Sequence, residues 1–210
     1  MNNHIIVSNV SDASFALGVG YAHSQKIDIS DIIALKTFIN NEFCPRFLQD
    51  HVTEETLGHG LKGKSVYIVS THSANHSRDE LAMRNYLIAS AAKENGAEFV
   101  ALVEPDLFYS AQDRGPRTVD HPQVTDFASR EKFVGQPCSA EIYAQLLKTS
   151  GVDSVMTVHN HKPDVMRKIY EKVNPQENSR GIPSFLNLDI APLIANYILR
   201  SGLIRLWNYG

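Results

Sequence analysis

The sequence predicts an α/β fold built on a mostly parallel sheet with helices on both faces. Two observations indicate this class: short, nearly continuous apolar runs, and stretches of helix-forming length between them. The chain has 210 residues, 43% of them hydrophobic, which suits one globular domain with a sizeable core. Because no internal repeat or interdomain linker is visible, we expect residues 1–210 to form a single α/β domain.

Five apolar runs are expected to form strands: residues 4–8, 31–38, 65–70, 98–104 and 153–159. The best-marked helix follows the third run, where Ser77 and Glu80 have the spacing of a capping box and Asn95-Gly96 supplies a stop. Further helices are expected between the first two runs, from Ser139 through Leu147, and from Ile190 to Leu199. Residues 43–62, 110–136 and 171–184 are expected to be long loops.

Charge, hydropathy and cysteine content exclude several classes of protein. The net charge of −3 argues against a general nucleic-acid binder, which needs a basic patch. No apolar run approaches the roughly 20 residues that span a bilayer, and the start MNNH lacks the features of a signal peptide. Two cysteines, Cys44 and Cys138, make no disulfide framework. We therefore expect a cytoplasmic protein without nucleic-acid or membrane partners.

Familiar short motifs do not identify a site. The sequence contains no GxGxxG, GxxxxGK[ST], GxSxG or CxxC, and Gly18-Val19-Gly20 lies inside a predicted helix. Topology is more informative, because ligands of parallel α/β sheets bind outside the carboxyl ends of the strands. Three segments should converge there: residues 70–72, 105–114 and 159–161.

His159 and His161 are two residues apart, so on extended backbone they would point the same way. Such a pair could hold a divalent metal or place an imidazole beside a phosphate. The alternative is that one ring packs against a neighbouring loop and the other is solvated. A nuclease of the His-Asn-His kind is not expected, because that chemistry needs a ββα-metal module.

Gln112, Asp113 and Arg114 place an amide, a carboxylate and a guanidinium in three consecutive positions. Beside a nucleotide, Gln112 could contact a base or ribose edge, Asp113 could hold a metal-bound water, and Arg114 could meet a phosphate. The alternative is an ordinary polar loop with a local Asp–Arg contact.

Phe38, Asn40 and Glu42 close the second predicted strand. An aromatic ring can stack on a purine while Asn and Glu contact its exocyclic groups. Strand ends often carry such residues without a ligand, so the pattern alone is weak. Cys44 and Cys138 are not expected to be nucleophiles, because neither has a local sequence that marks it.

Taken together, six segments resemble the N-terminal domain of ribose-phosphate pyrophosphokinase (phosphoribosyl pyrophosphate synthetase), in order over roughly residues 4–200. Tyr109 to Arg114 resembles the family's "Y-A-R-Q-D-R", and TSGVDSVMTVHNH resembles its "A-G-A-D-x-V-x-T-M-D-L-H". The other matching segments are residues 36–42, 63–71, 135–140 and 182–192.

The resemblance implies transfer of the β,γ-diphosphoryl group of ATP to the 1-hydroxyl of ribose 5-phosphate, with Mg²⁺. It further implies a homo-oligomer. Carried over by position, the adenine would be bound by Phe38, Asn40 and Glu42, and the rest of the nucleotide would lie along Gln112, Asp113 and Arg114. His161 would be the catalytic, metal-proximal histidine, and Asp189 would be a displaced metal ligand.

Several positions depart from the family pattern. The family's arginine before Gln-Asp is Ala111, the arginine and lysine of its "R-x-P-I-S-A-K" fall at Gly135 and Glu141, and two acidic positions are His159 and Leu186. The second domain, which would bind ribose 5-phosphate, is expected to be absent from this chain, so the chain alone should be inactive. An alternative from another class is a catalytically silent relative that associates with active subunits or senses nucleotide.

Overall fold

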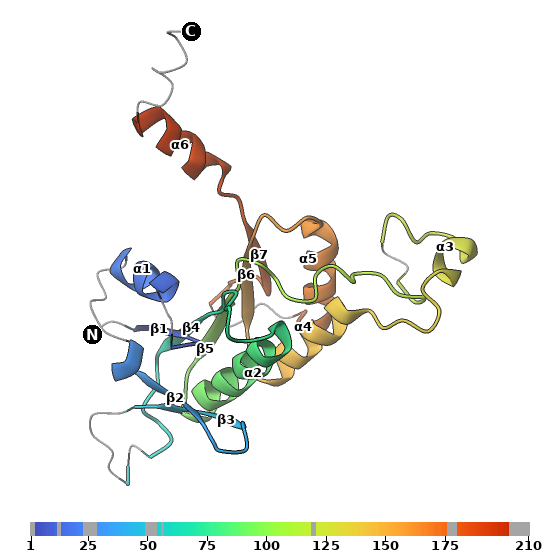
Figure 1. The fold of residues 1–210 in the computed structure, drawn as a ribbon. Helices are drawn as coiled ribbons and strands as arrows, with labels where there is room; N and C mark the ends of the chain where they lie inside the picture. The colour runs from blue at the N-terminus through green and yellow to red at the C-terminus, as the bar shows by residue number, and fades with distance from the viewer. Residues whose placement is uncertain are drawn as a thin grey trace.

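The computed structural model describes residues 3–11, 14–22, 29–48, 54–55, 57–118, 121–175 and 180–201. Its centre is a five-stranded, entirely parallel sheet in the order β1-β4-β5-β6-β7 (Figure 1). The strands are β1 (His4–Ser8), β4 (Ser65–Val69), β5 (Phe99–Val103), β6 (Ser154–Val158) and β7 (Phe185–Leu188). The α/β class and the mostly parallel sheet are therefore confirmed, and four of the five predicted strands lie in this sheet.

Three helices connect the central strands: α2 (Arg78–Glu94), α4 (Ser139–Thr149) and α5 (Pro163–Val173). Each crossover advances one strand in the same direction, and right-handed crossovers of that kind place their helices on one face of the sheet. Consistently, α4 packs between α2 and α5. The core lies between these helices and inward side chains such as Val66, Ile68, Val100 and Leu102, all fully buried.

The start of α2 is the element that the sequence predicts most accurately. The Ser77 hydroxyl accepts the Glu80 N–H at 3.2 Å, and the Ser77 N–H donates to the Glu80 carboxylate at 3.1 Å. This reciprocal pair is the predicted capping box.

The predicted strand over residues 31–38 does not belong to the main sheet. After the short helix η1 (Ile29–Asp31), β2 (Ile33–Thr37) pairs antiparallel with β3 (Phe43–Phe47) in a separate two-stranded hairpin. The apolar pattern predicts a strand but not its partner. The strand β3 lies in residues 43–62, which were expected to be loop. Its Pro45 is tolerated because a strand that pairs on one side only can leave one residue without a backbone donor.

The hairpin packs across α2 rather than onto the sheet. The Arg84 guanidinium of α2 lies 4.4 Å from the centre of the Phe43 ring and donates to the Asn9 carbonyl at 3.3 Å. Arg84 is buried, and burial lowers its pKa. One side chain thus joins the hairpin, α2 and the end of β1.

Two further differences lie in segments expected to be loops. The helix α3 (Phe127–Glu131) interrupts residues 110–136, and α5 runs into residues 171–184. The helix α5 has an apolar face at helical spacing, formed by the buried residues Val165, Met166, Ile169 and Tyr170. The helices α1 (Ser14–Ala22) and α6 (Ala191–Ser201) confirm their predictions.

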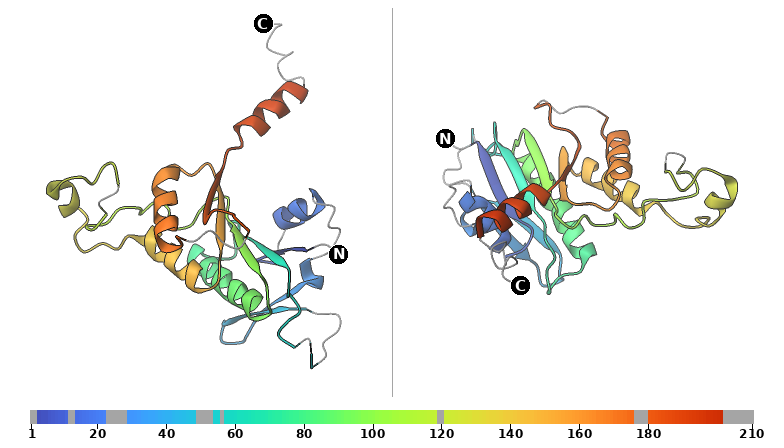
Figure 2. Two further views of the ribbon diagram at one scale, coloured as in Figure 1. Left: turned by 180° about the vertical axis from the view of Figure 1, so that it is seen from behind. Right: turned by 90° about the horizontal axis from the view of Figure 1, so that it is seen from above.

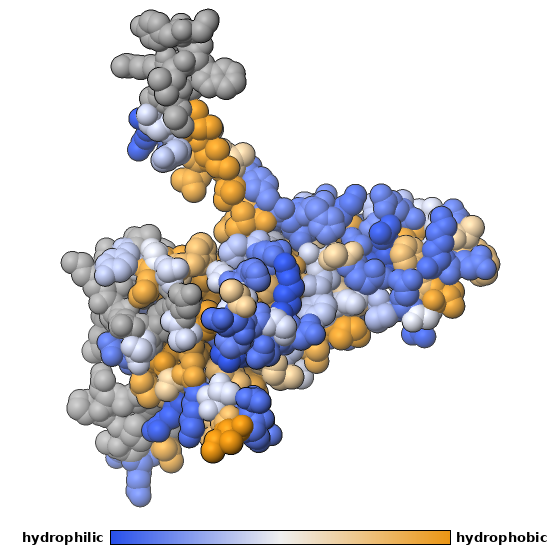
Figure 3. All heavy atoms as spheres, viewed as in Figure 1, coloured by the Kyte–Doolittle hydropathy of each residue, from blue (hydrophilic) through white to orange (hydrophobic). Residues whose placement is uncertain are grey.

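The last helix, α6, projects away from the sheet in Figure 1 and in the left view of Figure 2. Its apolar side chains gather on one side, where Leu193, Ile194, Tyr197 and Ile198 are exposed (Figure 3). Among the described helices, none combines the length and the apolar character needed to cross a bilayer.

Candidate functional site

A buried polar network closes the carboxyl ends of the central strands. Glu104 directly follows β5 and is fully buried. Its carboxylate accepts the Ser70 hydroxyl at 2.9 Å, the Asn85 amide at 3.1 Å and the Phe108 N–H at 2.9 Å. The Tyr143 hydroxyl lies 3.1 Å from both carboxylate oxygens. Burial raises the pKa of Glu104 to about 7, although these donors favour the charged form.

The segment after β5 leads from this network to Gln112, Asp113 and Arg114, which we call the polar trio. Gln112 uses its side-chain amide to donate to the Arg114 carbonyl at 2.8 Å and to the Gln136 side chain at 3.2 Å. The backbone carbonyl of Gln112 accepts the Ala140 N–H at 3.1 Å. Gln112 therefore ties this segment to the start of α4, and any contact with a ligand would compete with these bonds.

Asp113 is buried, and its carboxylate has two partners. The His121 Nε2 lies 3.3 Å from Oδ2, and the Arg114 Nε lies 3.5 Å from Oδ1. His121 Nδ1 accepts the Gln123 N–H at 3.1 Å, which leaves the ring proton on Nε2, aimed at Asp113. The local Asp–Arg contact that the sequence offered as an alternative is thus present, within a larger arrangement that includes a buried histidine.

Beside this pair is a cavity of about 80 Å³ with a basic lining. Arg117 lines it from the segment after β5, and Lys168 and Lys172 line it from α5. Glu141 also lines it and accepts from Lys172 at 2.8 Å. Cys138 borders the same space, and burial raises the pKa of its thiol, which disfavours a reactive thiolate.

The two histidines after β6 do not lie on the extended backbone that would make both rings point the same way. His159 has a φ of +46°, so the backbone is left-handed rather than extended, and the argument that both rings point the same way fails. His159 Nε2 lies 3.2 Å from the Asp189 carboxylate and accepts the Ile190 N–H at 3.2 Å. His161 is exposed at the same edge of the sheet. Asp189 also accepts the Ala191 N–H at 2.8 Å, which anchors the start of α6.

Phe38, Asn40 and Glu42 lie on the exposed turn of the β2–β3 hairpin. The Phe38 N–H donates to the Glu42 carbonyl at 2.8 Å, and the Asn40 side chain accepts the Glu42 N–H at 3.2 Å. Lys36 lies over the Phe38 ring at 4.6 Å, and the neighbouring Ile39 is fully exposed. The hydrogen bonds and ring contacts of these described residues stay within the hairpin, so the structure does not join the turn to the segments after β5 and β6.

Of the basic side chains close in sequence to the family segments, only some lie on the side of the sheet where the site is expected. Lys62 and Lys64 precede β4, so they lie at the amino ends of the strands, opposite the site. Arg114 and Arg117 follow β5; Arg114 contacts Asp113, and Arg117 lines the cavity that His121 and α5 also line. Ala111 and Gly135 are exposed, and Leu186 is a half-buried residue of β7.

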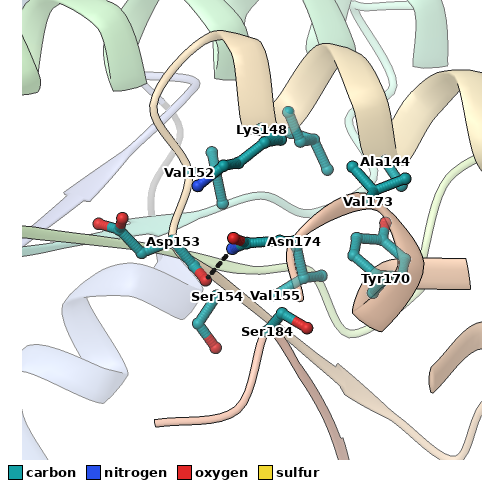
Figure 4. A pocket seen from close by; sticks show the side chains of 11 residues that line it. Ala144, Lys148, Val152, Asp153, Ser154, Val155, Tyr170, Val173, Asn174 and Ser184 are labelled. Atoms are coloured by element: carbon teal, nitrogen blue, oxygen red, sulfur yellow. Dashed lines mark hydrogen bonds between the residues drawn. The ribbon is translucent and has the colours of Figure 1, made fainter. Parts of the chain in front are cut away.

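Two other hollows do not lie at the carboxyl ends of the strands. One, of about 10 Å³, lies at the amino end of β6 beside the bond from Asn174 to the Asp153 carbonyl, and it has room for one water at most (Figure 4). The other, of about 350 Å³, is an apolar groove between α2 and α4, lined by residues such as Met83, Tyr86 and Ile142. The first is far too small for a triphosphate, and the second is lined mostly by apolar side chains and offers no basic group.

The donor atoms do not make a self-standing metal centre. Within the described ranges, no group of three or more His, Cys, Asp or Glu side chains is arranged to hold a metal ion. Asp189 is an exposed carboxylate that directly follows β7, at the carboxyl edge of the sheet where a nucleotide is expected to bind. Mg²⁺ commonly takes one or two carboxylates, substrate phosphates and waters, so the residues present fit a metal that arrives with a nucleotide.

Sequence reasoning missed His121 and Glu104. His121 lies in a segment expected to be loop, and no local pattern marks its contact with Asp113 eight residues away. Glu104 had a usable signal: it is an acidic residue at the end of an otherwise apolar run, where burial demands several hydrogen-bond donors.

No family model matches the chain, but curated proteins do. It is 25% identical over 135 residues to "Ribose-phosphate pyrophosphokinase 2" of Saccharomyces cerevisiae, covering 64% of this chain and 36% of the yeast protein. It is 25% identical over 190 residues to "Ribose-phosphate pyrophosphokinase 1" of Streptococcus agalactiae, covering 90% of this chain and 48% of the relative. The chain therefore spans about half the length of these relatives, or less.

A solved structure gives the same fold. The phosphoribosylpyrophosphate synthetase of Mycobacterium smegmatis superimposes with a TM-score of 0.65 at 18% identity, over 96% of this chain and 53% of that one. The chain thus has the architecture found in about half of that protein.

Proposed function

We propose that this chain, a relative of the ribose-phosphate pyrophosphokinases over the region it shares with them, is the ATP-binding part of such an enzyme. The enzyme would transfer the diphosphoryl group of ATP to the 1-hydroxyl of ribose 5-phosphate. One observation carries the proposal: in a chain that matches these proteins, Gln112 to Arg114 and His161 lie at the carboxyl edge of one parallel sheet, after the neighbouring strands β5 and β6.

Phosphoryl transfer asks a protein mainly to position the nucleotide and to neutralise developing charge. Arg114 supplies the positive charge of the polar trio. Its Nε lies 3.5 Å from Oδ1 of the buried Asp113, which positions the guanidinium. Gln112 would contact the nucleotide by exchanging its bond to Gln136. His161 is exposed at the carboxyl edge of the sheet, so its ring is accessible to a bound nucleotide, and it would face the phosphates as the catalytic histidine.

Cations around the 80 Å³ cavity support binding of the phosphate end. Ala111 and Gly135 stand where the family pattern has two arginines. A phosphate-stabilising arginine can raise the rate of phosphoryl transfer roughly a thousandfold or more. Arg117 and Lys168 line the cavity close behind Asp113 and His121. We propose that they replace part of the missing charge.

Asp189 and His161 would hold Mg²⁺ that arrives on the nucleotide. When bound, Mg²⁺ supplies neutralisation of the phosphate charge. For this, Asp189 would turn one oxygen from His159 Nε2 toward the metal, while it keeps its bond to the Ala191 N–H.

The hairpin turn supports a homo-oligomer. Phe38 and Ile39 expose apolar surface at its tip, where apolar atoms gather in Figure 3. Among the residues that the structure describes, no hydrogen bond or ring contact joins this turn to the strand-end segments of its own chain. We propose that Phe38, Asn40 and Glu42 bind adenine in a neighbouring subunit's site. We further propose that the ribose 5-phosphate site belongs to a second domain, that the chain alone is inactive, and that the protein acts in the cytoplasm.

The alternative is an inactive, associated relative. Ala111, Gly135, His159 and Leu186 motivate it. The named relatives do not favour it, because both are described as pyrophosphokinases.

Two measurements test the proposed function. Calorimetry with ATP and Mg²⁺ should show binding to this chain, and Arg114→Gln should weaken it about tenfold through the loss of a charge-assisted contact. The matched control is Arg180→Gln, because Arg180 pairs with Glu98, which directly precedes β5 at the amino ends of the strands, opposite the proposed site. No heat at millimolar nucleotide, or equal effects of both variants, would contradict nucleotide binding at this edge.

The second measurement is activity. The chain should release AMP from ATP and ribose 5-phosphate only when it is joined to the C-terminal half of a relative. If ATP binds but the joined protein shows no turnover, the inactive relative becomes the better description.

A further inference from the structure

Glu104 is a buried carboxyl for which the proposed reaction has no direct use. It lies beneath the site, and its oxygens accept from β4's end, α2, α4 and the segment that follows β5. The groups that face it are neutral: Asn9 and Ser70 from the ends of β1 and β4, Asn85 and Tyr86 from α2, Tyr143 from α4 and Tyr170 from α5. Hydrogen bonds, rather than a neighbouring cation, therefore stabilise the negative charge of the Glu104 carboxylate.

The bond from the Phe108 N–H is the one that reaches the site. It closes a turn from residue 104 to residue 108 at 2.9 Å. The next residue, Tyr109, has a φ of +57°, a conformation that a non-glycine residue keeps only when its surroundings impose it. The polar trio begins three residues later, and its far side is fixed by the bond from the Ala140 N–H to the Gln112 carbonyl.

We infer that Glu104 is a positioning residue whose ionised carboxylate holds residues 105–114 in the conformation that presents Gln112, Asp113 and Arg114 to the nucleotide. The inference rests on the proposed function, since it takes these three side chains to be the nucleotide contacts. Glu104 is buried and does not itself reach the ligand.

Protonation of Glu104 would weaken its hydrogen bond from the Phe108 N–H and so loosen residues 105–114. A hydrogen bond to a carboxylate is about twice as strong as one to a neutral group. Because the pKa of Glu104 is about 7, the carboxylate is mostly charged above neutral pH and mostly protonated below it. Nucleotide affinity should therefore rise with pH through about 7.

Glu104→Gln tests this, because the amide has the size of the carboxyl and mimics its protonated form. We expect ATP–Mg²⁺ affinity of the unmodified chain to increase about tenfold between about pH 6 and about pH 8.5, and that of Glu104→Gln to stay near the lower value. Titration of ATP itself affects both proteins equally, so the difference between the two profiles reports Glu104. Parallel profiles would overturn the inference.

Tyr143→Phe provides a second, milder variant. It removes a donor that lowers the pKa of Glu104, so the midpoint of the affinity profile should move to higher pH. Ser154→Ala is the control, because it removes a partly buried hydrogen bond of 2.7 Å to the Pro183 carbonyl at the amino end of β6, far from Glu104. It should leave the midpoint in place. An unmoved midpoint in Tyr143→Phe would count against the inference.

Amide hydrogen exchange separates this inference from the proposed function. Without nucleotide, at about pH 8, amides of residues 105–114 should exchange faster in Glu104→Gln, while those of β1 and β6 stay unchanged. If the chain binds no ATP, the proposed function fails, and exchange still shows whether Glu104 pins the segment. Equal exchange in both proteins, or a uniform increase across the sheet, would overturn the positioning role.

Discussion

The buried ring of His121 lies against the carboxylate of Asp113, with Nε2 3.3 Å from Oδ2. The same ring accepts the Gln123 N–H through Nδ1. His121→Phe keeps the bulk of the ring and removes both bonds. We expect it to reduce the free energy of unfolding by about 2 kcal/mol, because a buried acceptor and a backbone donor lose their partner. Urea denaturation measures this change.

An exposed histidine provides the control. His72→Phe, in the segment after β4, should change the free energy of unfolding by about 0.5 kcal/mol or less. Equal losses in the two variants would mean that the bond to Asp113 adds no stability.

Glu104 makes stability depend on pH in an unusual direction. Burial raises its pKa from 4.5 to about 7, so the folded chain holds this proton more tightly than the unfolded chain does. Its contribution is most favourable below about pH 4.5, falls as the pH rises to about 7, and is constant above that. The loss amounts to about 3 kcal/mol at about 1.4 kcal/mol per unit.

Glu104→Gln has no such titration. Relative to the unmodified chain, its free energy of unfolding should increase by about 3 kcal/mol between about pH 4.5 and about pH 8. Urea denaturation of both proteins at the two pH values gives this difference, in which other titrating groups cancel. A difference independent of pH would mean that Glu104 does not titrate in this range.

The central strands and α2 could be predicted from the sequence because their signals are local. An apolar run such as 98–104 must be buried whatever it pairs with, and Ser77 and Glu80 bond within one helical turn. The partner of a strand is not local. The run 31–38 has the composition of a sheet strand, and only the tight turn at Phe38–Glu42 returns it into a separate hairpin.

The site shows the same division. Topology alone places Gln112 to Arg114 and His161 at one edge of the sheet, as predicted. The expected alignment of His159 with His161 fails because the backbone leaves the extended region at His159, which no residue type there announces. The role of Glu104 depends on contacts with distant segments, and that of His121 depends on a contact within one loop that no local pattern marks. Whether Phe38, Asn40 and Glu42 bind adenine stays a prediction.

Gly151 is required by its surroundings. It has a φ of +100°, and a Cβ atom there would lie 2.6 Å from Lys93 Cγ. The Lys93 side chain cannot move freely, because its Nζ lies 2.6 Å from the Asp153 carboxylate. Gly151→Ala should therefore destabilise the chain by about 1–3 kcal/mol in thermal or urea unfolding.

Gly18 is the matched control, because it lies inside α1 and an added Cβ would meet nothing within 4 Å. Alanine is the better helix former, so Gly18→Ala should stabilise the chain by up to about 1 kcal/mol. Two substitutions of the same kind thus carry opposite expected signs, and a loss of stability in both would contradict this account of the two positions.

The proposed exchange of hairpins between subunits can be tested by mixing variants. Phe38→Ala damages the adenine contact on the hairpin turn, and Arg114→Gln damages the trio at the strand ends. Each variant alone should bind ATP weakly. If hairpins complete neighbouring sites, a mixed dimer has one site with both defects and one site with neither.

With random exchange of subunits, about half of the dimers are mixed, so about one quarter of all sites should recover the affinity of the unmodified chain. Calorimetry would then show a tight component that neither variant shows alone. If the hairpin instead serves its own chain, every site carries one defect and no tight component appears. Phe127→Ala, at an exposed phenylalanine of α3, should bind normally and so show that loss of a surface ring does not by itself weaken ATP binding.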